Sequence, residues 1–391
     1  MKNLADFVVF KDSSLAPRAG QKMPMSTLCE AYLDEALDIV DFDGFFESRN
    51  ELVDYSLTRE HVKQFVTRMV PEWTLHSRAQ DRRLVRDHYD RGDDFFEAFL
   101  GERMVYTSGF FQDESQSLEE GQDNKLDLVC QKIGLAPDAE LLDVGCGWGT
   151  LALHAARQYG ARATGVTLSQ NQTAFGNARI ERAGLAERAR IECRDYREIP
   201  NKTYDRIVSL EMVEHVGLKR LDSFFELIAA RLKDDGLFLL QFAGLRRGGG
   251  LGVPPVGMRP EDMIWGLFMN KYIFPGADAS PPLSTMLKSM EKAGFDIYSV
   301  ENISIHYSLT IRRWHDNWQR NADMVRKSYG ERWYRLWNFF LAWSWRIGAQ
   351  GNSECFQVVA HKNLDGFDRK IFLPRAAASL PRIKRAAVRA A

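Results

Sequence analysis

The sequence predicts an α/β fold with a mostly parallel sheet, preceded by a helical N-terminal domain. Two patterns carry this prediction. From Lys125 onward, short apolar runs alternate with amphipathic segments, as in βαβ units. Between Ser26 and Trp73 the apolar residues recur at helical spacing instead. With 391 residues, of which 45% are hydrophobic and 27% charged, the chain can bury cores of this size, and disorder is excluded as its main state.

Residues 1–80 are expected to form the helical N-terminal domain. Thr58 can cap a helix that ends before Pro71. Apolar residues occupy one face of that helix: Val62, Phe65, Val66 and Met69. Residues 81–130 are expected to be a helical connector that contributes to the functional site. The many aromatic residues between Arg82 and Phe111 are expected to lie mainly in the core.

Residues 131–365 are expected to form the sheet domain. Five strands are predicted in its first part, at Glu140–Val144, Ala163–Thr167, Arg190–Arg194, Tyr204–Ser209 and Leu237–Phe242. Three helices are predicted between them, at Thr150–Tyr159, Ser169–Ala183 and Arg220–Leu232. This alternation predicts helices that connect neighbouring parallel strands.

A helical cap is expected as an insertion at about residues 246–350. The Gly- and Pro-rich stretch Gly248–Pro260 indicates a flexible loop. The elements expected after it are a helix near Leu283–Ala293, a strand near Phe295–Ile303, an aromatic-rich helical pair from Leu309 to Ile347 and a closing strand near Cys355–His361. Tryptophans recur in the helical pair, either as core or as the lining of an apolar tunnel. Residues 366–391 are expected to be a basic tail.

Composition excludes several classes of protein. The 52 Lys and Arg residues balance 53 Asp and Glu residues, so no general basic excess favours a nucleic-acid partner. The five cysteines are scattered without a Cys-x-x-Cys pair, which argues against a disulfide framework, a structural zinc site or another metal centre and favours a reducing compartment. No signal peptide or bilayer-spanning stretch is expected.

A glycine-rich turn follows the first strand of the sheet domain. Asp143 is the last polar residue of that strand, and Gly145, Gly147 and Gly149 follow at alternate positions. Glycine allows a tight turn and lets a ligand approach the backbone. The G-x-G-x-G spacing differs from the G-x-G-x-x-G pattern of dinucleotide sites. The turn suits the aminocarboxypropyl arm of S-adenosylmethionine, which presents a zwitterion instead of a phosphate. A purely structural turn is the alternative.

The ends of the next two strands supply further polar groups. The second strand ends without an acidic residue, so a ribose would be bound by hydroxyl and amide groups around Thr167, Leu168 and Gln172. After the third strand, Asp195 and Tyr196 offer a carboxylate and a ring for an adenine. Ligands of open parallel sheets bind at the carboxyl ends of the strands. These segments together predict a bound S-adenosylmethionine.

These residues, with Tyr106-Thr107-Ser108 upstream and Glu211–Gly217 downstream, resemble the cyclopropane-fatty-acid synthase and mycolic acid methyltransferase family. The likeness extends from about Arg83 to Lys362. Three segments look most like the sphingolipid C9-methyltransferase branch: His88–Phe96, Leu240–Arg246 and Trp265–Ser280. The resemblance implies a Rossmann-like class I SAM-dependent methyltransferase sheet with a helical cap, and it adds Tyr106 and Thr107 to the cofactor site.

The resemblance also implies a reaction. Methyl transfer to a double-bond carbon of an unsaturated lipid acyl chain, in a phospholipid fatty acid or a sphingoid base, would pass through a carbocation to a methyl-branched or cyclopropane product. An alkene is a weak nucleophile, so the site must be dry and must position it closely. An aromatic ring can stabilise the cation, and the candidates are Tyr307, Phe274 and Tyr272.

In cyclopropane synthases a bound bicarbonate is thought to be the base, held by a Cys, a Glu, a His, an Ile backbone and a Tyr. The residues carried over to these positions are Cys146, Glu214 and Tyr307, with Gln241 at the His position and Ala243 at the Ile position. Glutamine can donate a hydrogen bond to an anion but cannot carry a positive charge. We therefore expect an altered anion site, with bicarbonate as an optional ligand, and a methyl-branched or methylene product.

Two alternatives stay open at this point: N-methylation of a small amine, and a catalytically silent lipid-binding module. For the lipid enzyme, the expected partners are an unsaturated membrane lipid and an anionic membrane surface, which the basic tail could contact. The expected location is the cytoplasm, peripheral to the membrane. The sequence does not determine whether the chain forms a homodimer.

Overall fold

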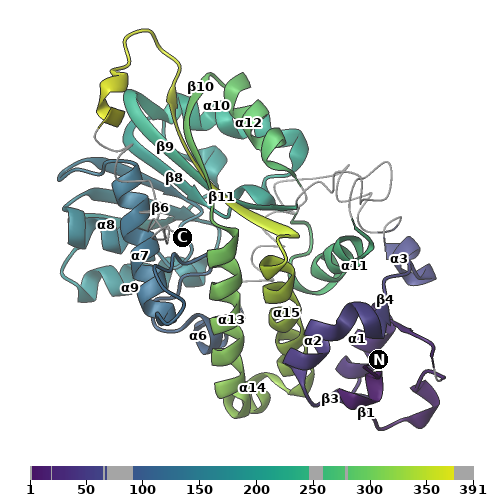
Figure 1. Cartoon of the computed structure of the whole chain (residues 1–391). Coiled ribbons are helices and arrows are strands. Elements are labelled where there is room, and N and C mark those ends of the chain that lie inside the picture. The colour runs from purple at the N-terminus through teal and green to yellow at the C-terminus, as the bar shows by residue number, and fades with distance from the viewer. Residues whose placement is uncertain are drawn as a thin grey trace, which may run out of the picture.

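A seven-stranded sheet organises the chain (Figure 1). The computed structural model describes residues 2–18, 20–64, 67, 91–245, 259–277 and 281–373. The strands of the sheet are β5 (Glu140–Val144), β6 (Arg162–Thr167), β7 (Ala189–Cys193), β8 (Tyr204–Leu210), β9 (Leu232–Leu245), β10 (Phe295–Asn302) and β11 (Ser353–Lys362). Their order is β10-β11-β9-β8-β5-β6-β7, and β11 pairs antiparallel with both neighbours. The connections reverse direction beside β5, so a ligand site is expected where β5 and β8 end.

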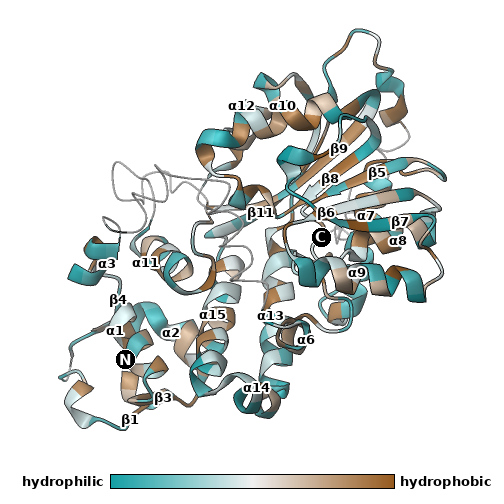
Figure 2. Ribbon diagram, turned by 180° about the vertical axis from the view of Figure 1, so that it is seen from behind, coloured by the Kyte–Doolittle hydropathy of each residue, from teal (hydrophilic) through white to brown (hydrophobic). Residues whose placement is uncertain are grey.

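Helices cover both faces of the sheet. The helices α7 (Leu118–Lys132), α8 (Thr150–Tyr159) and α9 (Gln170–Arg182) contribute to one core, and α10 (Leu221–Arg231) and α12 (Leu283–Lys292) contribute to the other. Figure 2 shows apolar residues concentrated along the central strands between these layers. The predicted α/β class is confirmed, and the predicted strands and helices of residues 140–242 are found within a few residues of their expected ends.

The N-terminal segment contains helices and two short ladders. Its elements are η1 (Leu4–Asp6), β1 (Val8–Phe10), η2 (Ser13–Leu15), β2 (Met23–Pro24), α1 (Met25–Leu33), β3 (Leu37–Ile39), α2 (Phe42–Leu52), β4 (Val53–Asp54) and α3 (Arg59–Gln64). β1 pairs antiparallel with β3, and β2 pairs parallel with β4; neither ladder was expected. Thr58 Oγ1 accepts a hydrogen bond from the His61 amide at 3.4 Å, as predicted for a cap. Val62 is exposed, and Phe65, Val66 and Met69 lie outside the described residues.

The helices of the cap come from three parts of the chain. α6 (Asp93–Leu100) belongs to the connector, whereas α11 (Pro260–Phe268) and η7 (Met269–Ile273) follow β9. α13 (Ser304–Arg320), α14 (Ala322–Tyr329) and α15 (Glu331–Ala349) follow β10. The predicted cap insertion is therefore divided by α12 and β10. One hydrophobic core joins Phe45 of α2, Phe95 of α6 and Trp337 of α15. The tryptophans Trp314, Trp318, Trp337 and Trp343 are buried in this core, in agreement with the core interpretation.

A buried ion pair connects the N-terminal segment to this cap. Arg49 of α2 is 0% exposed, and its Nε donates to Glu261 Oε1 of α11 at 2.5 Å. The Tyr55 hydroxyl and the Trp343 indole donate to the same oxygen, each at 3.2 Å. A second Arg49 nitrogen donates to Gln350 at 2.7 Å. The guanidinium is thus held by partners from two other parts of the chain, Glu261 of α11 and Gln350 directly after α15.

Several predicted features cannot be placed. His88–Asp90, Arg246–Met258, Asp278–Ser280 and the basic residues after Leu373 lie outside the described residues. The last described element is η8 (Arg369–Phe372). Among the helices that the structure describes, none combines the length and the apolar composition needed to cross a bilayer.

Candidate functional site

The glycine turn between β5 and α8 opens onto a pocket. Gly147 has φ +53°, and a Cβ added to it would meet no atom within 4 Å. Gly145 has φ +82°, and its added Cβ would approach Met212 Cγ at 2.4 Å. Gly149 begins α8 at φ +74°, and its added Cβ would lie 2.7 Å from Ile191. Gly145 and Gly149 therefore permit close packing, whereas Gly147 leaves space for a ligand.

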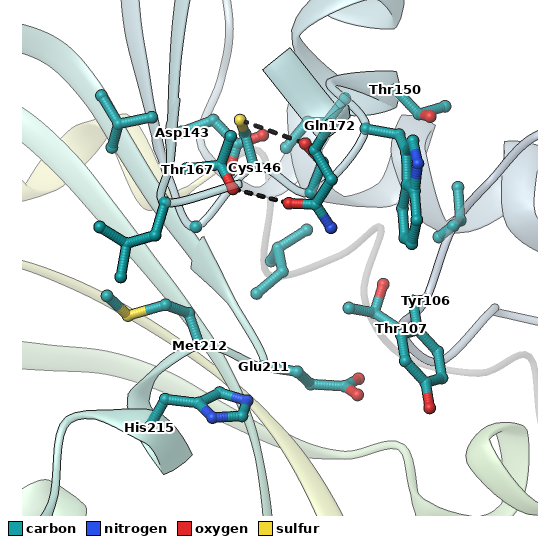
Figure 3. A pocket seen from close by; sticks show the side chains of 18 of the residues that line it. Tyr106, Thr107, Asp143, Cys146, Thr150, Thr167, Gln172, Glu211, Met212 and His215 are labelled. Atoms are coloured by element: carbon teal, nitrogen blue, oxygen red, sulfur yellow. Dashed lines mark hydrogen bonds between the residues drawn. The ribbon is translucent and has the colours of Figure 1, made fainter. Parts of the chain in front are cut away.

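This pocket encloses about 1260 Å³, including its open mouth, which is enough for a nucleoside ligand. Figure 3 shows its side chains. Most of the predicted cofactor residues line it: Tyr106, Thr107, Asp143, Gly145, Gly147, Thr167, Leu168, Gln172 and Tyr196. Gly149 and Asp195 are not among the residues that line it. The pocket occupies the carboxyl ends of β5, β6 and β8, as the reversal of connections predicts.

The hydroxyl and amide groups predicted to bind a ribose at the end of β6 contact each other. Thr167 Oγ1 donates to Gln172 Oε1 at 2.6 Å, and Figure 3 shows both side chains on one wall. The oxygen of the amide is therefore engaged, which leaves its NH₂ group directed away from Thr167 as a donor. Asp195 is not part of the pocket lining, and its carboxylate accepts from Arg197 at 2.8 and 2.7 Å. Tyr196 and Arg197 line the pocket in its place.

A buried lysine, missed in the sequence, lies at the base of the pocket. Lys125 of α7 is 1% exposed, and its Nζ donates to Thr107 Oγ1 at 2.8 Å. Burial lowers the pKa of Lys125 to about 8 and raises the pKa of Asp143 to about 7, although the charge of Lys125 opposes the second shift. The signal was available, because Lys125 interrupts the apolar face formed by Leu118, Leu126 and Val129.

Two glutamates follow β8 and form the centre of the site. Glu211 lines the pocket, and its Oε1 accepts from the Ser108 amide at 2.9 Å and from Gln241 Nε2 at 2.6 Å. Glu214 lies deeper, and its Oε1 accepts from the Ala243 amide at 2.6 Å. These hydrogen bonds fix both carboxylates against the end of β9.

The surroundings of the two carboxyl groups affect their pKa values differently. Burial raises the pKa of Glu214 to about 8, and the negative charge of Glu211 adds to this shift. Burial also raises the pKa of Glu211, but hydrogen bonds from Ser108, Gln241 and Tyr307 and the charge of Lys125 oppose the rise. Carboxyl groups whose environments differ in this way take different protonation states. Glu214 therefore holds a proton near neutral pH, and Glu211 is the member of the pair whose neighbours favour the ionised form.

This division predicts a pH dependence of stability. The folded state keeps a proton on Glu214 that the unfolded state releases between its ordinary pKa and about 8. The free energy of unfolding should therefore fall as the pH rises through that range. Glu214→Gln keeps the acceptor for the Ala243 amide but cannot ionise, so its melting temperature should fall less between about pH 5 and pH 8. Thermal unfolding at both pH values tests this, with exposed Glu187→Gln as the control. Equal pH slopes in wild type and Glu214→Gln would contradict it.

The structure brings together three of the four predicted catalytic residues. Glu214 and Gln241 lie beside Glu211, and Tyr307 hydrogen-bonds Glu211. Cys146 is not among them. Its thiol packs at Gly165 of β6 and donates to the Gly147 carbonyl at 3.6 Å, and Figure 3 shows it beside Gln172, across the pocket from Glu211.

The thiol beside the glutamates is instead that of Cys355. Its Sγ lies 3.7 Å from Glu211 Oε1 and comes from β11, the closing strand. Sequence reasoning missed Cys355, Ser108 and Glu211. The spacing of three residues between Glu211 and Glu214, directly after a strand, was the available signal for the second acid.

The residues present do not fit a bound bicarbonate in the expected manner. The Gln241 amide already donates to Glu211, and the Ala243 amide already donates to Glu214. The donors that the resemblance assigns to an external anion are thus bound to the protein's own carboxyl groups. Within the described ranges, no group of three or more His, Cys, Asp or Glu residues is placed to hold a metal ion.

Comparison with known proteins gives consistent results. A family model described as mycolic acid cyclopropane synthetase matches residues 76–358. Sphingolipid C9-methyltransferase 2 of Gibberella zeae is 48% identical over 361 residues, which cover 90% of this chain and 67% of the relative. The sphingolipid C9-methyltransferase of Komagataella phaffii is 46% identical over 388 residues, which cover 94% of this chain and 76% of the relative. The solved cyclopropane synthase MmaA2 from Mycobacterium tuberculosis has a TM-score of 0.67 and 30% identity, covering 72% of this chain and 98% of that one.

Proposed function

The chain belongs to the mycolic acid cyclopropane synthetase family and is a SAM-dependent methyltransferase, and on this premise we propose that it methylates a double-bond carbon of an unsaturated sphingoid base. The observation that carries the proposal is a pocket in which a glycine turn and the Glu211 carboxylate lie together, with Glu214 buried beside Glu211 and an aromatic cap next to the site. The names of the relatives support the lipid class. An unsaturated phospholipid fatty acid is the alternative lipid.

The pocket residues suit S-adenosylmethionine. Gly145 and Gly147 would bind its aminocarboxypropyl arm, Thr167 and Gln172 its ribose, and Tyr196 its adenine. When bound, this cofactor supplies a methyl group made electrophilic by a sulfonium. The space above Gly147 and the amide of Gln172 are the features that fit it. No metal is required for this chemistry.

An alkene needs a dry site, and aromatic residues supply one. Phe274 lies with its ring centroid 6.0 Å from Tyr106 and 6.2 Å from His215, and both of these residues line the pocket. Such a ring can stabilise a carbocation on the lipid chain through its quadrupole. Tyr272, the other cap candidate, hydrogen-bonds Glu30 of α1 and borders a separate cavity. Phe274 and Tyr307 are therefore the favoured candidates.

The product is expected to be a methyl-branched alkene. Gln241 stands where cyclopropane synthases are thought to place a histidine, and it cannot relay a proton. Incubation with a sphingoid base that has an isolated double bond, and with donor carrying a deuterated methyl group, distinguishes the outcomes by mass spectrometry. A branched alkene retains all of the methyl deuterium, whereas ring closure loses one deuteron. A mainly cyclopropane product would contradict this assignment. A monounsaturated phosphatidylcholine tests the alternative lipid.

A small amine is the second candidate substrate. Glu211 places a carboxylate in the pocket, and a carboxylate can bind an amine or take its proton. Incubation of the enzyme with labelled donor and a small secondary amine, followed by mass spectrometry, distinguishes the amine from the lipid as substrate. Preferential turnover of the amine would exclude the lipid proposal.

We also propose that the enzyme works in the cytoplasm at an anionic membrane surface. The lipid chain resides in the membrane, and basic residues near such a surface contribute about 1 kcal/mol each. Sedimentation with vesicles of anionic and of neutral lipid tests this, and equal binding to both would contradict it.

A further inference from the structure

We propose that the Glu211 carboxylate takes the place of a bound bicarbonate as the base that receives the proton after methyl transfer. This inference rests on the proposed function and names the base of that reaction. It starts from the Gln241 side chain and the Ala243 amide, which were expected to donate to a bound anion and instead donate to Glu211 and Glu214. Gln241 Nε2 and the Ser108 amide both donate to Glu211 Oε1, at 2.6 and 2.9 Å.

Glu211 is placed to reach a substrate. It lines the same pocket as Gly147 and Tyr106. Figure 3 shows its carboxylate directed into the open centre of the pocket, toward Tyr106 and Thr107. Glu214 lies behind it with its Oε1 bound to the Ala243 amide. Of the two carboxyl groups, Glu211 is therefore the one that can touch the reacting carbons.

A chain of amides fixes the orientation of Gln241. Lys132 Nζ can only donate, and it donates to Gln357 Oε1 at 2.6 Å while it also pairs with Glu301. The Gln357 NH₂ group therefore faces Gln241 Oε1, at 2.8 Å. Gln241 must then direct its own NH₂ group at Glu211. Lys132 and Gln357 thus act as positioning residues that keep a donor on the charged carboxylate.

The backbone at Glu211 is strained. Its φ of +53° lies in the left-handed region, which is unfavourable for a residue with a long side chain. The Glu211 amide donates to the Gln241 carbonyl at 2.7 Å, which holds this conformation at the end of β8. Strain of this kind persists where the surroundings enforce it, and it is concentrated at functional sites.

The groups around Glu211 favour its ionised form in the pair. Lys125 of α7 contributes a positive charge, and Tyr307 of α13 a hydrogen bond. Glu214 takes the proton of the pair, and burial keeps the Cys355 thiol of β11 neutral by raising its pKa. A carboxylate that is ionised and held by donors can act as a base.

The step balances without another reactant. The π electrons of the lipid double bond form the new bond to the donor methyl carbon, whose bond to sulfur breaks with its electron pair left on sulfur. A hydrogen then leaves the methyl-bearing carbon as a proton to Glu211. The electron pair of that C–H bond restores the double bond next to the new branch. Glu211 later releases the proton to water.

Two substitutions test this assignment. Glu211→Gln keeps the shape but cannot accept a proton, and Glu211→Gly relieves the positive φ and opens the position to an anion. Both should bind S-adenosylmethionine by calorimetry and lose about 100-fold or more in turnover, as for a removed general base. Added bicarbonate should restore at least part of the Glu211→Gly rate and none of the Glu211→Gln rate. Wild-type turnover should be the same in carbonate-depleted buffer.

Glu35→Gly is the matched control, because Glu35 also has a positive φ, of +61°, and is exposed in the N-terminal segment. It should leave turnover unchanged. A fully active Glu211→Gln, or a wild type that requires bicarbonate, would overturn the proposal. A Glu211→Gly variant that no anion restores would overturn the placement of Glu211 at the anion position. Absence of lipid methylation by the wild type would refute the proposed function itself.

Discussion

Gly147→Val is expected to abolish binding of S-adenosylmethionine. The added side chain would project into the space above the glycine turn, where a Cβ now meets no atom within 4 Å. A β-branched residue is also strained at φ +53°. We expect the dissociation constant measured by calorimetry to rise by about 100-fold or more, equivalent to roughly 2.7 kcal/mol. Methyl transfer should be lost with it.

Gly184→Val provides the control for backbone strain. Gly184 has φ +69° and also has no atom within 4 Å of an added Cβ, but it lies between α9 and β7, outside the pocket lining. The control should lower the melting temperature and leave cofactor affinity unchanged. If Gly147→Val retained wild-type affinity, the cofactor would have to bind elsewhere.

Glu261→Ala is expected to produce the largest loss of stability. It leaves the fully buried Arg49 guanidinium without its carboxylate, and removing one partner of a buried pair costs about 3–5 kcal/mol. The hydrogen bonds from Tyr55 and Trp343 would be lost as well. Chemical denaturation should show a lower free energy of unfolding, and the melting temperature should fall.

Asp34→Ala is the matched comparison. Asp34 pairs with Arg332 at 2.5 Å and also joins the N-terminal segment to the cap, but the two side chains are 63% and 56% exposed. Exposed pairs contribute about 1 kcal/mol or less. Equal effects of Glu261→Ala and Asp34→Ala would show that burial does not determine the importance of the connection.

Local patterns predicted the sheet and much of the cofactor pocket. Alternating apolar runs identified the strands, and the glycine spacing identified the turn, because each depends on residues close together in sequence. Thr167 and Gln172 were assigned to the pocket for the same reason. Strands of two or three residues, such as β2 and β3, are too short to show an alternating pattern, so the N-terminal ladders were missed.

The carboxylate site could not be predicted fully, because it depends on pairing between distant strands. Gln357 of β11 lies opposite Gln241 of β9, and Cys355 lies opposite Ala243. A shift of one residue in that register would direct these side chains to the other face of the sheet. Such a pairing joins residues more than a hundred positions apart, and the sequence alone does not determine it. The position of Cys355 beside Glu211 depends on this register, and for that reason it was missed.

The late position of β11 has a consequence for biosynthesis. β11 inserts between β9 and β10 and follows both in sequence, so the sheet is completed only after residues 353–362 have left the ribosome. A nascent chain that ends before residue 353 already contains the glycine turn and both glutamates, but it lacks the Gln357 side chain that orients Gln241. We expect such a polypeptide to be inert toward lipid, so that competence for the reaction arises only after β11 has been synthesised.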